Sequence, residues 1–135
     1  MIVIKNFVLE RLLIRLEAEG IAIKYSTEDN PALSDEQFPH MSFVESDDAA
    51  YTKTLTRKGE THALKMYSIG IYSNSESGRQ AEAEAIAEIV DDEMQTMGFL
   101  RRAMVPLSNL NNATIYRISA RYSGLVDKSG MIYRY

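Results

Sequence analysis

The chain of 135 residues contains no cysteine, and this absence excludes disulfide bonds, thiolate nucleophiles and thiolate metal ligands together. Long apolar runs are also missing, because no segment reaches about 18 consecutive apolar residues, so no membrane span is predicted. The sequence has no G-x-G-x-x-G, no phosphate-binding loop, no zinc-ligand spacing and no G-x-S-x-G. These absences indicate a soluble cytoplasmic protein, for which we predict no catalytic residue, cofactor or resident metal.

An excess of basic residues is missing as well, because the formal net charge is -4. A uniformly basic nucleic-acid-binding protein is therefore disfavoured, although a local basic patch stays open. The length fits one domain over residues 1–135. The shares of hydrophobic residues, 45%, and charged residues, 25%, are typical of a globular domain with a buried core.

Two segments space their apolar residues three or four positions apart, which predicts amphipathic helices. The first covers residues 6–19, and Gly20 is placed to end it. The second covers residues 78–97, with Ser75 or Ser77 as the N-cap and its acidic residues on the solvent side. The residues expected to face the core are Leu9, Leu12, Leu13 and Leu16 in the first helix and Ile86, Ile89, Val90, Met94 and Met97 in the second.

Strand patterns, rich in β-branched and aromatic residues, fill most of the remaining chain. The segment 62–73 is fairly apolar on both sides of its alternation, which predicts a central strand covered on two sides. The order of elements predicts an α+β fold, with one mostly antiparallel or mixed β-sheet and two main helices packed on it. The predicted strands are residues 21–25, 38–45, 51–56, 62–73, 100–107, 114–126 and 131–135, with a turn at 57–60.

The closing segment TIYRISARYSGLVDKSGMIYRY, residues 114–135, predicts a β-hairpin. Alternation places Tyr116 and Tyr122 on one face and Arg117 and Arg121 on the other. Gly130 suits the left-handed position of the turn between the two strands. The rings of the strand are therefore expected to point toward the core, and its guanidinium groups away from it.

Three interpretations of this arginine face stay open. A solvated face is common on antiparallel sheets. A protein interface is the second interpretation, because arginine and tyrosine are favoured anchors there. A nucleic-acid surface is the third, but stacking platforms need exposed rings interleaved with cations, whereas here the rings take the opposite face. We therefore expect no specific nucleic-acid binding.

The helix predicted at 78–97 carries an acidic face. Glu84, Glu88 and Asp91 are four and three residues apart, so they line one side of a helix. Such a side can hold Mg²⁺, as in helical nucleotide pyrophosphohydrolases, and a metal-dependent nucleotide hydrolase is the alternative function. That chemistry normally draws carboxylates from two or more helices, and the first helix offers no matching cluster. The other interpretation is a solvated helix face.

The segments IYSNSESGRQAEAEAIAEIVDDEMQTMGFLRR and NNATIYRISARYSGLVDKSGMIYRY resemble the small tail-completion proteins of long-tailed bacteriophages and prophages. These comprise tail terminators, head–tail joining proteins and similar minor structural proteins. The shared pattern is a strand ending at 72–74, then Gly78 and a helix rich in glutamate and alanine that ends at 97–99. An Arg121–Tyr122 strand then leads into the closing hairpin. The likeness covers residues 63–135 and rests mainly on the order of the elements.

The resemblance implies a non-enzymatic assembly protein that forms a homo-oligomeric ring, often a hexamer, on the last ring of tail-tube subunits. Such a ring ends tail-tube growth, joins the tail to the head, or does both. The implied partners are copies of the chain itself, a tail-tube protein and a head-connector protein. The implied location is the tail or neck of a virion, after assembly in the bacterial cytoplasm. The family has no catalytic residues to carry over, and we expect no membrane partner.

A ring requires two different surfaces of each subunit to meet, and complementary charge would steer that contact. We therefore predict a contact between the arginine face and the acidic helix face. The polar segments 26–37 and 45–62 are further contact candidates, because long loops in compact domains are often functional. The candidate subunit-interface residues are Arg117, Arg121 and Arg134 on one side and Glu84, Glu88 and Asp91 on the other.

Overall fold

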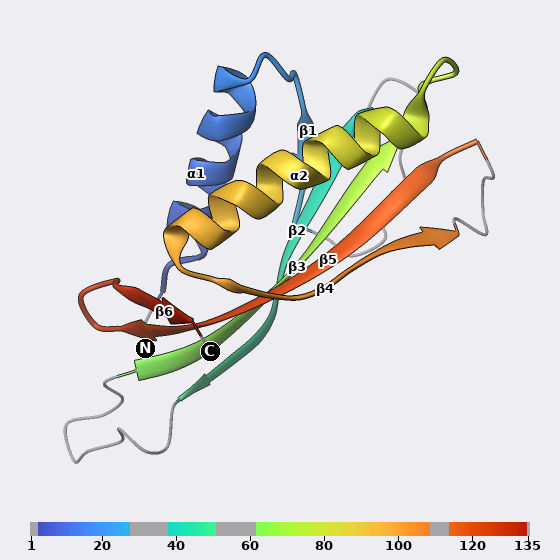
Figure 1. Ribbon diagram of the computed structural model, residues 1–135. Helices are drawn as coiled ribbons and strands as arrows, with labels where there is room; N and C mark the ends of the chain where they lie inside the picture. Colours follow the sequence, from blue (N-terminus) through green and yellow to red (C-terminus); the bar gives the residue numbers. More distant parts are fainter. Residues whose placement is uncertain (1–2, 28–37, 51–61, 109–113, 135) are drawn as a thin grey trace.

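A computed structural model describes residues 3–27, 38–50, 62–108 and 114–134 of the chain. The described residues form two helices and a six-stranded sheet (Figure 1). In chain order the elements are α1 (Lys5–Ala18), β1 (Lys24–Ser26), β2 (His40–Ala50), β3 (His62–Ser73), α2 (Arg79–Met97), β4 (Leu100–Ser108), β5 (Tyr116–Asp127) and β6 (Ile132–Arg134). The strand and turn predicted at 51–60 lie outside the described residues.

The sheet is mixed, with the strand order β1-β2-β3-β5-β4 and with β6 paired to the end of β5. β1 runs parallel to β2, and every other pair is antiparallel. This arrangement confirms the predicted α+β fold with one mixed sheet and two helices. β3 begins and ends where the sequence pattern places it, whereas β1 begins three residues later than predicted.

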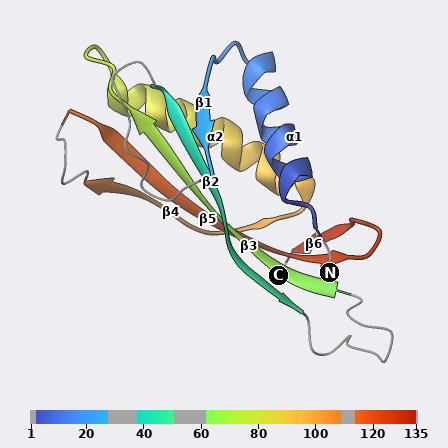
Figure 2. The ribbon, with the colours of Figure 1, turned by 180° about the vertical axis from the view of Figure 1, so that it is seen from behind.

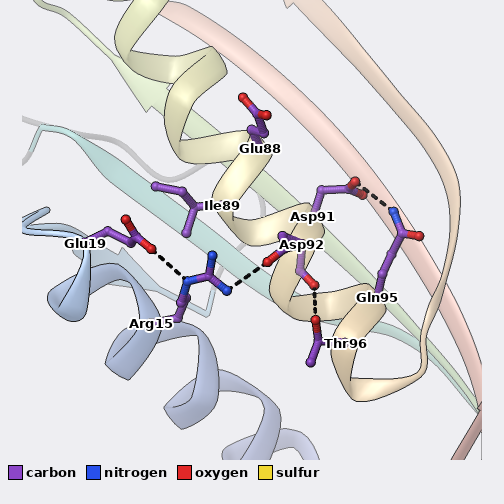
Figure 3. Close-up of a pocket in the computed structure, with 8 residues that line it drawn as sticks. All are labelled: Arg15, Glu19, Glu88, Ile89, Asp91, Asp92, Gln95 and Thr96. Atoms are coloured by element: carbon purple, nitrogen blue, oxygen red, sulfur yellow. Dashed lines mark hydrogen bonds and ion pairs between the residues drawn. The ribbon is translucent and has the colours of Figure 1, made fainter.

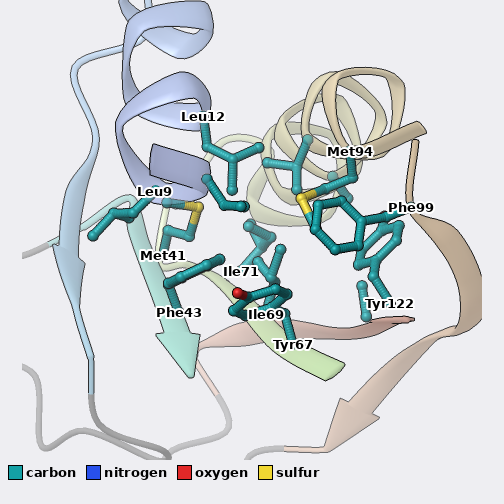
Figure 4. Close-up of a cluster of buried hydrophobic side chains, with 14 of the residues drawn as sticks. Leu9, Leu12, Met41, Phe43, Tyr67, Ile69, Ile71, Met94, Phe99 and Tyr122 are labelled. Atoms are coloured by element: carbon teal, nitrogen blue, oxygen red, sulfur yellow. The ribbon is translucent and has the colours of Figure 1, made fainter. Parts of the chain in front are cut away.

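Both helices lie on the same face of the sheet, as the two opposite views show (Figures 1 and 2). The core fills the space between this helix layer and the sheet, and α1 contributes leucines that lie near Met41 and Phe43 (Figure 4). The aromatic ring of Tyr67 stacks on Phe43, with 5.0 Å between ring centroids, and meets Phe99 edge-on at 5.5 Å. β3 is the central strand of the five, as predicted; the described helices cover one side of it, and on the other side Gly70 and Tyr72 are also buried.

Alternation along β3 and β5 decides which side chains enter the core. In β5, Ile118, Ala120 and Tyr122 are buried against the helices, whereas Arg121 is exposed on the opposite, helix-free face. Because cross-strand partners share a face, the pairing of Tyr67 with Tyr122 places both rings in the core. The predicted separation of rings from guanidinium groups along this strand is confirmed.

Glycines set the ends of two elements. Gly98 follows α2 in the left-handed conformation, with φ +109°, and its N–H donates to the carbonyl of Gln95. A Cβ at this position would lie 2.7 Å from the carbonyl oxygen of Ile132, so β6 is packed directly against the end of the helix. The N-cap prediction of Ser75 or Ser77 is wrong, because Gly78 occupies that position and no side chain caps the helix.

The β5–β6 hairpin forms as the sequence predicts. Gly130 has a φ of +87°, and its N–H donates to the carbonyl of Asp127. The carboxylate of Asp127 accepts hydrogen bonds from the backbone N–H groups of Ser129 and Met131 and from the hydroxyl of Tyr133. The hydroxyl of Ser129 also donates to this carboxylate, and it contributes most to the lowered pKa of Asp127, with the other bonds lowering it further. Neither described helix has the length and apolar character needed to cross a membrane.

Candidate functional site

The helix-free face of the sheet gathers the arginines of β4 and β5. Arg117 and Arg121 are four positions apart on β5, so both point to this face. Arg102 joins them, because its Nε donates to Ser123 Oγ at 2.8 Å and Ser123 shares their face. A register shift between Arg101 and Ala103 breaks the alternation of β4 here, and this β-bulge directs Arg102 to the helix-free side.

The two β5 arginines have different surroundings. Arg117 is half-buried and its guanidinium lies over the ring of Tyr72, 5.3 Å from the centroid. Such cation–π contact fixes the side chain against the sheet. Arg121 is exposed and faces solvent. The predicted third member, Arg134, lies in β6, but its side chain is outside the described residues.

Apolar side chains border the arginines at the sheet edge. Val105 and Leu107 on β4 are 46% and 39% exposed. They pair with Ser119 and Arg117, so they lie on the same helix-free face. The chain contains no aspartate or glutamate from position 94 to position 126, so this end of the sheet is basic along both strands. We name Arg102, Val105, Leu107, Arg117 and Arg121 the sheet patch.

The three residues of the predicted acidic face of α2 have different surroundings. Glu84 and Glu88 are exposed on α2, but the carboxylate of Asp91 is directed into the fold. Asp91 accepts a hydrogen bond from the hydroxyl of Tyr122 at 2.8 Å and pairs with Arg101 at 3.3 Å. Burial, then the bond to Asp91, raises the pKa of Tyr122 above its usual range, so the phenol remains the donor. Asp91 therefore serves the internal packing of α2 on the sheet.

The metal-site interpretation finds no geometric support in the described ranges, where no three acidic or histidine side chains are grouped closely enough to hold an ion. Three carboxylates of α2, those of Asp91, Asp92 and Glu93, are instead bound by arginines from other elements. Arg15 pairs with Asp92 at 2.9 Å and with Glu19 at 3.1 Å (Figure 3). A pocket of about 640 Å³ lies beside these pairs, between α1 and α2, and it is lined mostly by polar side chains.

One buried charge was not predicted from the sequence. The side chain of Glu93 is only 8% exposed, although the acidic residues of α2 were expected on the solvent side. Its carboxylate accepts from Arg11 Nη2 at 2.7 Å and from Arg15 Nη1 at 3.2 Å. These bonds cross from α1 to α2, so they fix the orientation of α1 and decide which of its sides remains in solvent. We name Arg11, Arg15, Asp92 and Glu93 the interhelix network.

Comparison with known proteins identifies a fold rather than a family. No family model matches the chain, and no curated protein matches it. Among solved structures, the chain is similar to one from the virion of a native gene transfer agent (GTA) particle, with a TM-score of 0.59 and 17% sequence identity. The match covers 86% of this chain and 88% of that chain. The protein therefore has an α+β fold that also occurs in a chain of a virion.

Proposed function

We propose that the protein is a non-enzymatic structural component of a phage-type virion. In this proposal it forms a ring at the head-proximal end of a long tail, where it ends tail-tube growth, joins the tail to the head, or does both. The observation that carries the proposal is the shared fold, since a virion chain matches over most of both chains. The tail-completion resemblance of residues 63–135 supports the same role, with the tail-tube and head-connector proteins as partners.

The chemistry of the described polar residues is consistent with assembly rather than catalysis. The carboxylates of Asp91, Asp92 and Glu93 are each bound to arginine within the subunit, so arginine balances their charge there. The sheet patch combines exposed arginines with exposed apolar side chains, and such mixtures are typical of protein interfaces. We therefore propose the sheet patch as one of the two surfaces that meet around the ring.

Electron microscopy of the purified protein with tail tubes tests this function. We expect a ring at one end of each tube and none along its sides, and tubes assembled in its presence should stop at a shorter length. Tubes that remain bare and grow unchanged would refute the tail-completion role. As a separate check, a metal-dependent hydrolase should melt at a higher temperature with Mg²⁺ or Mn²⁺. The structural role predicts an unchanged melting temperature.

Charge reversal tests the sheet patch within this proposal. Exchanging Arg117 and Arg121 together for glutamate should weaken the oligomer, because like charges would then face the partner surface. Arg121 is exposed, so Arg121→Glu alone should leave the fold intact and gives a control for unfolding. Light scattering at low and moderate salt measures the oligomer. An oligomer of unchanged size at both salt concentrations would show that the sheet patch is not part of the interface.

A further inference from the structure

We infer that the partner of the sheet patch is the outer side of α1 in a second copy of the chain. Ring formation by this contact rests on the proposed function. The contact differs from the one predicted from the sequence in the surface that meets the arginines. The prediction from the sequence made the acidic face of α2 the partner of the arginines. Asp91 of that face, however, accepts a hydrogen bond from Tyr122 inside the subunit. An occupant of the sheet patch needs acidic groups on the surface and apolar groups beside them, and α1 supplies both.

The outer side of α1 carries an exposed stripe that alternates apolar and acidic residues. Phe7, Glu10, Ile14 and Glu17 are spaced by three, four and three residues, which places them along one side of the helix. All four are exposed, with Phe7 at 48% and Ile14 at 61%. We name these four residues the α1 stripe. Exposed apolar residues aligned in this way, with no described element of the subunit covering them, are typical of an interaction surface.

The interhelix network determines the charge of the α1 stripe. Arg11 and Arg15 lie beside the stripe, but their guanidinium groups bind Glu93 and Asp92 on α2. Their positive charge is therefore balanced within the subunit. Glu10 and Glu17 have no such arginine among the described residues, so their charge remains available to a partner. The stripe presents net negative charge with two apolar side chains.

The sheet patch has the complementary composition. Arg121 and Arg102 are exposed there, Val105 and Leu107 supply apolar surface, and the strands carry no acid in this region. Glu10 and Glu17 are about 10 Å apart along the helix axis, at 1.5 Å per residue. Arg121 and Ser123, the residue that binds the exposed Arg102, are two residues apart on β5, which is about 7 Å at 3.3 Å per residue. Long arginine side chains span such a difference, so two ion pairs can form around one apolar contact.

The positions of the two surfaces favour a ring. α1 leads into β1 at one edge of the sheet, and β4 forms the opposite edge (Figures 1 and 2). The α1 stripe and the sheet patch also belong to opposite layers of the subunit, because the helices cover one face and the patch lies on the other. Contact between two different surfaces at opposite ends of a subunit is heterologous. Repetition of such a contact closes a ring or extends a filament.

Cysteine cross-linking tests this contact, since the native chain has no thiol. We would place one thiol in the stripe with Ile14→Cys and one in the patch with Val105→Cys, and treat the mixed proteins with a short bismaleimide. A covalent dimer should form in the mixture and in neither protein alone. The double variant, with both cysteines in one chain, should give a ladder of covalent multimers that stops at the size of the ring.

Glu84→Cys supplies the matched control, because Glu84 is exposed and acidic but lies on α2. Cross-linking of Glu84→Cys to Val105→Cys, without cross-linking of Ile14→Cys, would overturn our assignment and restore the α2 surface. Homodimers of Ile14→Cys alone would indicate a two-fold contact and would overturn it as well. A native protein that is monomeric by mass would instead refute the ring of the proposed function, so the two failures are distinguishable.

A charge exchange gives a second, independent measurement. Arg121→Glu or Glu17→Arg alone should raise the concentration needed for half-assembly by roughly tenfold, because each places like charges opposite one another. Mixed with each other, the two variants should regain assembly through one restored contact. Glu88→Arg serves as the control on α2 and should leave assembly unchanged. A variant that carries both Arg121→Glu and Glu17→Arg should also regain assembly. If its assembly is weakened by the sum of the two single effects, the pairing of the stripe with the patch is overturned.

Discussion

Glu93 offers the sharpest test of how the structure orients α1. The glutamate is buried between the helices, whereas the arginines that bind it are partly exposed, with side-chain exposures of 42% for Arg11 and 30% for Arg15. Glu93→Gln removes the charge and keeps the size of the side chain. The freed guanidinium groups can take up water, so we expect a loss of about 2 kcal/mol, near the lower range for charge-assisted hydrogen bonds.

The reverse change should cost more. Arg11→Met with Arg15→Met leaves the carboxylate of Glu93 buried without its donors, and breaking a buried ion pair in this way typically costs about 3–5 kcal/mol. Adding Glu93→Met to that double variant removes the stranded charge and fills the same space. The triple variant should therefore be more stable than the double variant, although it lacks one more native side chain.

Urea unfolding measures these changes, because urea is uncharged and does not screen the ion pairs. The free energy of unfolding is compared at one protein concentration, since assembly would otherwise contribute to it. If the slope of the unfolding free energy against urea concentration is unchanged, the variants expose the same amount of surface on unfolding. A Glu93→Gln variant that is less stable than the arginine double variant, or a triple variant without recovery, would refute the reasoning.

Three further predictions concern the fold. Gly98→Ala should destabilise the protein more than Gly20→Ala, since both glycines have positive φ but only at position 98 would a Cβ meet the β6 backbone. Gly20→Ala, the control, should lower the free energy of unfolding in urea by roughly 1–2 kcal/mol. The raised pKa of Tyr122 predicts stability that is present below the ordinary value of 10.0 and lost above it, and Tyr122→Phe should lessen this loss in melting curves up to pH 11. The lowered pKa of Asp127 predicts hairpin stability above 3.8 that is lost as the pH falls below that value, as amide exchange would show.

Local periodicity explains the parts of the fold that the sequence predicts. The two-residue alternation of β5 separates Tyr122 from Arg121, and burial enforces it because a one-residue slip would place a guanidinium in the core. The predicted α2 begins one residue before the observed helix, and its end agrees because Gly98 ends the helix through its backbone conformation. These features depend on neighbours in sequence, so pattern alone is sufficient.

The candidate site depends on contacts between distant segments, and there the sequence is less informative. Glu93 and Glu88 look alike in the helix pattern, and only the packing of α1 buries the first and exposes the second. Arg102 reaches the helix-free face through a β-bulge, and no residue type in this segment predicts that bulge. The α1 stripe was hidden because Phe7 and Ile14 belong to an amphipathic helix whose leucines already account for its core side.

The mass of the native assembly tests the central claim most directly. The chain is 15.3 kDa, and we expect native mass spectrometry of the unmodified protein to give one dominant closed oligomer, six copies being the expected number. The Arg121→Glu variant, measured at the same concentration, should show less of the closed oligomer. A protein that remains monomeric at concentrations of tens of micromolar, or that forms only dimers, would contradict the account.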